Sequence, residues 1–173
     1  VQAVRTQTKE LVHCSNLFSI PEQVRLAKRL VDKIGPGKVL FCNSGAEANE
    51  GLLKLARLAG NQNSDSPRHG IVVAENGFHG RTLGALSATA SPKYRKGFEP
   101  LLPSFSFAKL NDIQAFDQAI SADTSAVLVE SIQGEGGIYV ADDSFLLWQV
   151  CVEVVWVEVV WEGVAAGAAV EWV

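Results

Sequence analysis

The stretch NSGAEANE, residues 43–50, joins two segments of different character. The run before it, Lys38 to Cys42, is short and apolar, which predicts a buried strand. The run after it, Glu47 to Ala59, repeats leucine and alanine on one helical face, which predicts a helix. The corner between them is small and contains a glycine. A strand, a tight corner and a helix in succession are typical of an α/β domain.

The same arrangement occurs twice more. IVVA (71–74) leads into ENGFHGRT, with a helix predicted from Arg81 to Ala88, and SAVLVE (125–130) leads into SIQGEGG after a helix predicted at 112–120. Apolar strands that alternate with helices predict an α/β fold with a mostly parallel sheet covered by helices on both faces. Ligands of such sheets bind outside the carboxyl ends of the strands. We therefore expect the three corners, each following a strand, to converge on one site.

Two further segments flank these units. SIPEQVRLAKRLVDKIG (19–35) predicts a helix, with Ser19 and Glu22 at capping-box spacing and Gly35 at its end. SPKYRKGFEPLLPSF (91–105) has three prolines and no clear period, which predicts a long irregular excursion.

Composition excludes several classes of function. The chain has 173 residues, 47% of them hydrophobic, and 19 acidic against 15 basic side chains that are scattered along it. Nucleic acid and a membrane are therefore not expected as partners. The three cysteines lack CxxC spacing, so neither a metal site nor a disulfide framework is predicted. The first residues show no secretory signal, and without an initiating Met we expect the true N-terminus to be missing.

The last part of the chain differs from the rest. Residues 147–173 hold all four tryptophans, and VEVVW occurs at 152–156 and again at 157–161. A five-residue period matches neither a helix nor a strand. We expect residues 1–146 to form part of one domain and residues 147–173 not to belong to the native fold.

The corner NSGAE has the chemistry of an anion site. The first N–H groups of a helix have no partner within it, and the helix dipole favours a negative charge there. Ser44, Gly45 and Ala46 are small enough for a phosphate to approach. An alternative interpretation is that Ser44 and Glu47 only form a capping box. The P-loop and GxGxxG motifs are absent.

The other two corners carry an aromatic ring and charges. Phe78 can stack on a flat ligand, and Arg81 presents a planar fork for a carboxylate, although a lone Phe is commonly a core residue and a lone Arg is commonly solvated. His79 is interpreted as a structural or supporting histidine. Glu130 and Glu135 either line a cleft, where they can pair with an arginine or tune a cofactor, or are exposed loop acids.

Four segments in order carry a resemblance to a known family: HCSNLFSIPEQVRLAKRLV, FCNSGAEANEGLLKLAR, ENGFHGRTLGALSATA and VLVESIQGEGG. Over roughly residues 11–145 the chain resembles the class III, pyridoxal-phosphate-dependent aminotransferases, and within them the branch that acts on N2-acetylornithine. The resemblance implies part of the large cofactor-binding domain of a fold-type I aminotransferase. The branches that act on ornithine or 4-aminobutyrate share most of these motifs and remain alternatives.

The resemblance implies roles for individual residues. Ser44, Gly45 and Ala46 match the corner that binds the phosphate of pyridoxal 5'-phosphate, and Phe78 matches the aromatic residue that stacks on its ring. Arg81 matches the arginine that binds the substrate α-carboxylate. Glu135 matches a glutamate that can pair with a distant arginine, and Glu130 lines the same region without an assigned role. Ser131 stands where proline is usual.

The resemblance also implies parts that this chain lacks. The family's Schiff-base lysine lies well downstream of the third corner, but no Lys or Arg follows Lys109, and the Asp-Glu-x-Gln segment expected after position 145 is absent. No catalytic residue is assigned. We expect a fragment that is inactive alone, from an enzyme that transfers an amino group to 2-oxoglutarate and is a homodimer when intact. Its location would be intracellular: cytoplasmic in a bacterium, the mitochondrial or plastid matrix in a eukaryote. Alternatively, the chain is a non-catalytic truncated subunit that acts through dimerisation.

Overall fold

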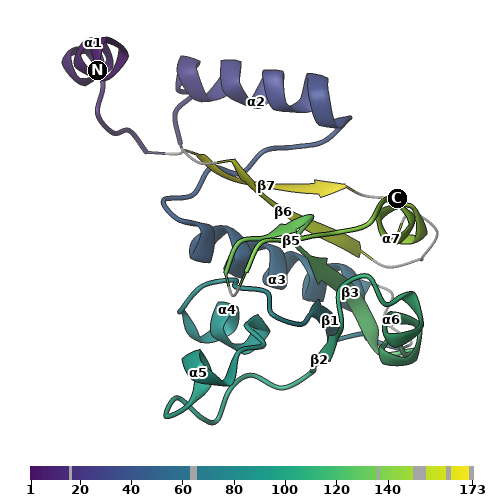
Figure 1. Cartoon of the computed structure of the whole chain (residues 1–173). Coiled ribbons are helices and arrows are strands. Elements are labelled where there is room, and N and C mark those ends of the chain that lie inside the picture. The colour runs from purple at the N-terminus through teal and green to yellow at the C-terminus, as the bar shows by residue number, and fades with distance from the viewer. Residues whose placement is uncertain (16, 63–65, 136, 150–154, 163–164, 172–173) are drawn as a thin grey trace. The chain divides into compact units, whose positions relative to one another are not determined.

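The computed structural model describes residues 1–15, 17–62, 66–135, 137–149, 155–162 and 165–171 (Figure 1). The chain divides into two compact units, Val1–Pro36 and Gly37–Val173.

The first unit contains α1 (Gln2–Glu10) and α2 (Pro21–Ile34). The prediction of α2 is confirmed, and the Gly35 N–H closes it by donating to the Val31 carbonyl at 3.0 Å. The predicted Ser19 cap is wrong, because the residue that precedes the helix is Ile20 and no side chain caps it. Glu22 instead pairs with Arg25 at 2.7 Å. Helix α1 was not predicted.

The second unit is built around a five-stranded sheet in the order β2-β1-β3-β6-β7. Strands β2, β1, β3 and β6 run parallel to one another, and the edge strand β7 runs antiparallel to β6. A small antiparallel pair, β4 with β5, stands apart. The elements are α3 (Gly45–Gln62), β1 (Gly70–Ala74), α4 (Leu83–Ala88), α5 (Pro92–Arg95), β2 (Phe105–Ala108), α6 (Ile113–Ala119), β3 (Thr124–Val129), β4 (Ile132–Gln133), β5 (Tyr139–Val140), α7 (Asp143–Gln149), β6 (Val155–Glu162) and β7 (Ala165–Glu171).

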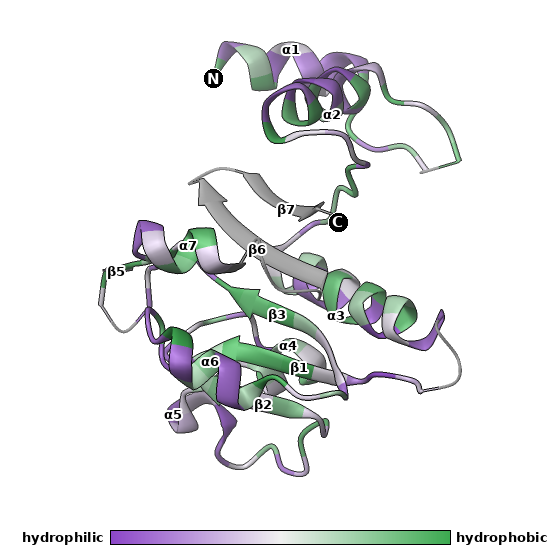
Figure 2. Cartoon of the chain, turned by 90° about the vertical axis from the view of Figure 1, so that its right-hand side faces the viewer, coloured by the Kyte–Doolittle hydropathy of each residue, from purple (hydrophilic) through white to green (hydrophobic). Residues whose placement is uncertain are grey.

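Helices cover both faces of the sheet, as predicted. In Figure 2, α3 lies on one side of β1 and β3, and α6 and α7 lie on the other. On the first side Leu52, Leu53 and Ala56 of α3 pack against Ile71, Val73, Ala126 and Leu128. On the second side Phe116 of α6 and Phe145 of α7 pack against Val72, Val127 and Val129. Successive residues of a strand point to opposite faces of the sheet. Because helices cover both faces, β3 is buried along its whole length.

Two predictions about the strands are wrong. Residues 38–42 form no strand, and the side chain of Leu40 remains 63% exposed. Conversely, β2 starts at the end of the segment predicted to be irregular and pairs with β1 from Phe105 onward. A strand exists only where a neighbour completes its hydrogen bonds, and composition alone does not supply that neighbour.

The C-terminal segment forms regular structure that its five-residue repeat did not predict. Helix α7 crosses the expected boundary at 146, β6 runs parallel to β3, and β7 returns beside β6. Valine and tryptophan favour extended backbone whatever their spacing. The expectation that residues 147–173 lie outside the native fold stays a prediction.

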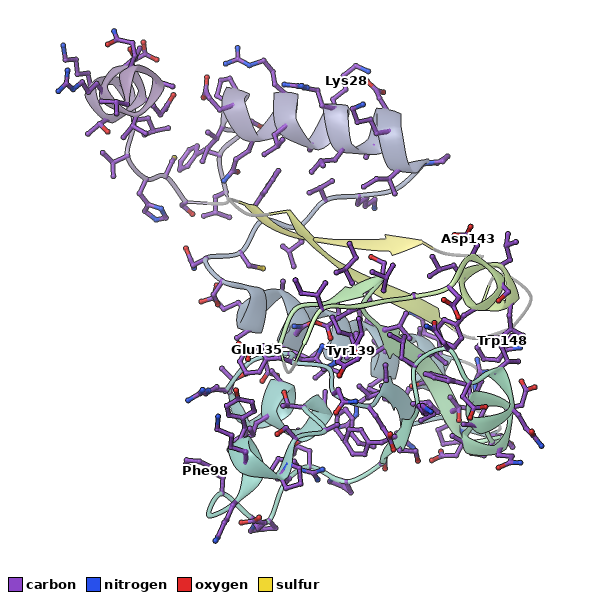
Figure 3. The ribbon with its side chains drawn as sticks, viewed as in Figure 1. Lys28, Phe98, Glu135, Tyr139, Asp143 and Trp148 are labelled. Atoms are coloured by element: carbon purple, nitrogen blue, oxygen red, sulfur yellow. The ribbon has the colours of Figure 1, made fainter. Side chains whose placement is uncertain are left out.

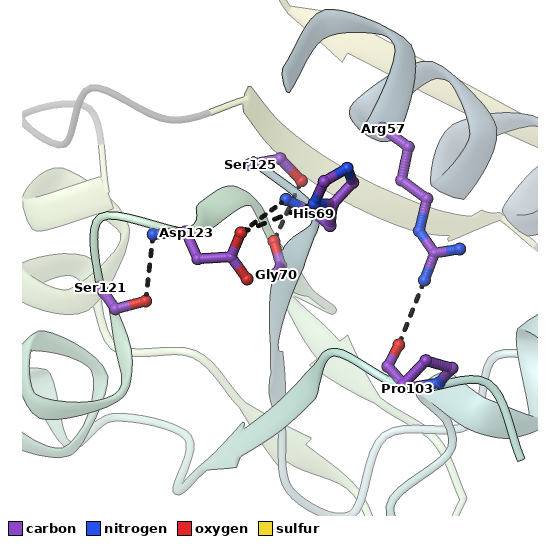
Figure 4. Close-up of polar contacts among 7 residues, drawn as sticks. All are labelled: Arg57, His69, Gly70, Pro103, Ser121, Asp123 and Ser125. Carbon is purple, nitrogen blue, oxygen red and sulfur yellow. Dashed lines mark hydrogen bonds and ion pairs between the residues drawn. The ribbon is translucent and has the colours of Figure 1, made fainter. Parts of the chain in front are cut away.

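At the amino ends of β1 and β3 a set of polar contacts holds the strands together (Figure 4). The His69 N–H donates to Asp123, and the Ser125 hydroxyl donates to the Gly70 carbonyl at 3.0 Å. Arg57 of α3 donates to the Pro103 carbonyl at 3.2 Å. These contacts lie at the opposite end of the strands from the three corners. No helix in the described part of the chain is long and apolar enough to span a membrane.

Candidate functional site

The first corner is the N-terminus of α3, and its side chains cap the helix. The Ser44 Oγ accepts the Glu47 N–H at 3.2 Å, and the Glu47 carboxylate accepts the Asn43 N–H at 2.7 Å. Ser44 therefore caps the helix as the capping interpretation predicted, but Glu47 accepts from Asn43 and not from the Ser44 N–H that a capping box requires. The cap does not exclude a ligand, because neither contact uses the N–H groups of Gly45 and Ala46.

The first corner has room at the side-chain position of Gly45. A Cβ atom built on Gly45 meets no atom within 4 Å. Among the described residues, the N–H groups of Gly45 and Ala46 have no hydrogen-bond partner. This corner is the N-terminus of the 18-residue helix α3, which carries the positive end of the helix dipole. The corner fits a phosphate, with Glu47 the negative charge nearest along the helix.

The second corner packs directly on the first. A Cβ atom on Gly80 would lie 2.7 Å from the Cβ of Ala46, so only glycine permits this approach. The Asn49 amide donates to the His79 carbonyl at 2.7 Å. The Glu50 carboxylate accepts from the Thr82 hydroxyl and from the N–H groups that begin α4. Residues in the first two turns of α3 thus hold the loop that carries Phe78 and Arg81.

The third corner is joined to the second by hydrogen bonds. The Phe78 N–H donates to the Glu130 carboxylate at 3.3 Å, and the Gln133 amide donates to the Glu75 carbonyl at 2.7 Å. The predicted convergence of the three corners is confirmed. The expectation that each follows a strand is wrong for the first, which follows a segment without regular secondary structure; the other two follow β1 and β3.

Glu130 and His79 are buried beneath the corners. A Cβ atom on Gly77 would lie 2.9 Å from Glu130 Oε2 and 2.8 Å from His79 Nε2, so the two side chains share one space. Burial raises the pKa of Glu130 to about 7, against the opposing effect of the Phe78 N–H, and the charge of Glu135 raises it further. Burial lowers the pKa of His79 to about 4. At neutral pH the histidine is uncharged and Glu130 is about half protonated.

Buried polar atoms without a partner mark this part of the site. Among the described residues, both ring nitrogens of His79 and the Asn49 Oδ1 form no hydrogen bond. An unpaired buried polar atom costs free energy, so a group that satisfied these atoms would bind favourably. His79 thus lies in the interior as a supporting residue, as the sequence suggested.

A ring that sequence reasoning missed completes the site. Tyr94, from the short helix α5, contacts Phe78 edge to face at a centroid distance of 5.4 Å. The Arg81 guanidinium carbon lies 4.7 Å from the centroid of the Tyr94 ring. The Tyr94 hydroxyl donates to Glu135 Oε2 at 3.3 Å. Figure 3 labels Glu135 in the loop between β4 and β5. Nothing in the sequence PKYR marks this tyrosine, because its partners come from other corners.

The arrangement suits a flat, anionic ligand. One end offers a helix N-terminus, the middle offers the half-buried ring of Phe78, and the far end offers the exposed Arg81 and Glu135. Among the described residues, Arg81 forms no ion pair, so its guanidinium donors remain available to a carboxylate. No group of three or more metal-binding side chains lies together in the described part of the chain.

The sequence was compared with families of known proteins. The family model of the class-III aminotransferases matches residues 1–153. Curated relatives include acetylornithine aminotransferases of Caldanaerobacter subterraneus (47% identical over 84% of this chain), Methanocaldococcus jannaschii (46% over 84%) and Aquifex aeolicus (44% over 88%). The chain spans 37% of the length of the first two and 41% of the third.

The fold was compared with solved structures. An ornithine aminotransferase from Toxoplasma gondii superposes with a TM-score of 0.81 and 27% identity, covering 91% of this chain and 39% of that one. A second structure of that enzyme, with partial occupancy of PLP at its active site, gives 0.82. A transaminase from a marine Virgibacillus gives 0.80 at 22% identity, which shows the fold alone. The parallel sheet with its helices is therefore that of the transaminases.

Proposed function

The chain belongs to the class-III aminotransferase family, and from this premise we propose that it is part of a pyridoxal-phosphate-dependent transaminase that moves an amino group from N2-acetylornithine to 2-oxoglutarate. The observation that carries this proposal is the convergence of three groups at one edge of the sheet: a helix N-terminus with two N–H groups that have no partner among the described residues, an aromatic ring, and an arginine that forms no ion pair there. Curated relatives at 44–47% identity are named acetylornithine aminotransferases, which supports this branch over the ornithine and 4-aminobutyrate branches.

The residues of this chain fit the cofactor. When bound, pyridoxal phosphate supplies an aldehyde that takes up the amino group and a ring that withdraws electrons from it. The N–H groups of Gly45 and Ala46, with the Ser44 hydroxyl, would hold the phosphate. Phe78 would pack on the ring. The Glu130 carboxylate accepts the Phe78 N–H and so sets the position of Phe78.

The residues toward solvent would bind the substrate. Arg81 presents two parallel N–H donors, the geometry that a carboxylate accepts best. Glu135 lies at the hydroxyl of the same Tyr94 ring and places a negative charge near that site. This chain would orient the substrate but provides no lysine at a position that the family motif assigns to the proton transfer.

Binding of the phosphate can be tested on this chain directly. Pyridoxal phosphate should shift the backbone amide NMR signals of Gly45 and Ala46. The amide of Gly84 is the internal control, because it already donates to Glu50 at 3.0 Å. Inorganic phosphate should shift the same two signals more weakly. Signals of Gly45 and Ala46 that stay in place at saturating pyridoxal phosphate would refute the proposed phosphate site.

The amino donor can be tested on the complete protein. Reading the encoding DNA beyond codon 140 in all three frames shows whether a downstream lysine and an Asp-Glu-x-Gln segment exist. The complete protein should then transfer the amino group of N2-acetylornithine to 2-oxoglutarate faster than that of ornithine or 4-aminobutyrate. A preference for ornithine would assign the chain to the alternative branch.

We also propose that this chain does not turn over by itself. Borohydride reduction in the presence of pyridoxal phosphate should label none of the eight lysines selectively, because none matches the family's lysine motif. Peptide mapping by mass spectrometry gives the readout. A single labelled lysine, with the others unmodified, would contradict this proposal.

A further inference from the structure

Tyr94 contacts Phe78 and Arg81 of the second corner, Glu135 of the third corner, and its own neighbour Lys93. Its ring contacts Phe78 at 5.4 Å between centroids, and the guanidinium of Arg81 and the ammonium of Lys93 lie 4.7 Å and 5.4 Å from its centroid. Its hydroxyl donates to Glu135. Tyr94 is itself partly buried, whereas Arg81, Lys93 and Glu135 are exposed.

Each contact restricts a side chain that would otherwise be mobile in solvent. A cation over the face of an aromatic ring is attracted by its quadrupole, and a planar guanidinium can stack there with its N–H groups still free. A phenol that donates to a carboxylate holds that carboxylate at the ring's rim. Arg81 thus lies over the ring of Tyr94 and Glu135 lies at its hydroxyl, and the two opposite charges form no ion pair with each other in the described part of the chain.

We propose that Tyr94 is a positioning residue that holds Arg81 and Glu135 apart on one aromatic platform, so that Arg81 stays open to the carboxylate of an incoming substrate. The inference rests on the proposed function for the identity of that carboxylate. Lys93, which stands over the same ring, adds a second positive charge. Loss of the ring frees Arg81 to pair with Glu135 and closes the site.

The platform can be tested without a ligand. Tyr94 and Tyr139 are the only two tyrosines, so the full chain labelled with 3-fluorotyrosine gives two fluorine NMR signals, which Y139F assigns. Arg81→Leu and Glu135→Gln should each shift the Tyr94 signal and leave the Tyr139 signal in place. A Tyr94 signal that responds to neither substitution overturns the proposal.

The consequence for binding is tested with glutarate, a dicarboxylate without a reactive group, observed by saturation transfer to the unlabelled chain. Arg81→Leu should abolish binding. Y94L should weaken it by about threefold or more, the loss expected for an exposed cation–π contact. Y94F, which keeps the ring, should weaken it less, and Y139F should bind as the original chain does.

The variants separate this inference from the proposed function. If Arg81→Leu abolishes binding but Y94L binds as the original chain does, the positioning role of Tyr94 is overturned and the carboxylate site stands. If Arg81→Leu binds normally, or if the original chain binds no glutarate, the carboxylate site itself is overturned, and the inference falls with it. An unchanged Tyr139 fluorine signal in Y94L itself shows that this variant keeps its structure.

Discussion

Gly80 lies so close to Ala46 that a Cβ atom on the glycine would come within 2.7 Å of the alanine Cβ. Residue 46 belongs to the first turn of α3 and residue 80 to the loop after β1, so this contact joins the first corner to the loop that carries Phe78 and Arg81. Gly80 also has a φ of 127°, a region that favours glycine.

Gly80→Ala should destabilise the chain by about 3 kcal/mol, because backbone strain and overpacking both contribute. Gly97→Ala is the matched control: its φ is 91°, but no atom lies within 4 Å of the added methyl group. The control should cost about 1 kcal/mol from strain alone. Urea unfolding measures both values. Equal losses in the two variants would mean that the contact with Ala46 contributes nothing.

Glu50 caps α4 in place of a side chain from that helix. One carboxylate oxygen accepts from the Thr82 hydroxyl at 2.5 Å and from the N–H groups of Gly84 and Ala85 at 3.0 and 3.1 Å. Glu50→Ala should cost about 1–2 kcal/mol, as removal of other helix caps does, and Glu50→Gln should cost less because an oxygen acceptor remains. Hydrogen exchange at the Gly84 and Ala85 amides should accelerate in Glu50→Ala. Unchanged exchange there would show that the cap is dispensable.

Glu130 should make the stability of the chain fall as pH rises. Its pKa is about 7 in the folded state and 4.5 as the ordinary value, so the folded chain binds the proton more tightly between these two limits. Its stabilising contribution is complete below pH 4.5 and is lost as pH rises to about 7. Glu130→Gln keeps an acceptor for the Phe78 N–H and removes this dependence.

The stability difference between Glu130→Gln and the original chain should therefore grow by about 2–3 kcal/mol between pH 4.5 and pH 8. Gln114→Ala, an exposed substitution on α6 that removes no ionisable group, should show a constant difference over the same range. Urea unfolding at several pH values provides the measurement. A flat difference for Glu130→Gln would indicate that this carboxyl group ionises normally.

His79 should make the stability of the chain rise as pH rises, the opposite of the effect of Glu130. Its folded pKa of about 4 lies below the ordinary 6.5, so its contribution to stability is present above pH 6.5 and is lost as pH falls toward 4. His79→Leu removes a buried ring whose nitrogens have no partner among the described residues. The variant should equal or exceed the original chain in stability at pH 7.5, and by pH 5 its advantage should increase by about 2 kcal/mol.

Exposed Gln114 provides the control, since Gln114→Ala removes no ionisable group and should leave the pH dependence unchanged. Thermal unfolding followed by circular dichroism at pH 5 and pH 7.5 is sufficient. An advantage of His79→Leu that does not increase on acidification would show that the buried histidine takes up a proton without difficulty.

The sequence by itself determined the α/β class, the two-sided cover of the sheet and the three corners. These depend on local periodicity: a buried strand such as β3 is apolar throughout, and an amphipathic helix such as α2 repeats every three to four residues. Ser44, Gly45 and Ala46 could be identified because a helix N-terminus has the same chemistry in any protein. The motifs also suggested Phe78, Arg81, Glu130 and Glu135 as site residues, and the structure brings them together.

Only the tertiary structure decided which segments became strands and how the corners meet. Residues 38–42 have the composition of a strand but find no partner, whereas β2 forms because β1 lies beside it. The hydrogen bonds from Phe78 to Glu130 and from Tyr94 to Glu135 join residues 52 and 41 positions apart in the chain. Burial, which shifts the pKa values of Glu130 and His79, is likewise a property of the packed molecule. Strand pairing, long-range contacts and burial depend on segments that local sequence patterns do not relate to one another, which is why the site was predicted in outline and its geometry was not.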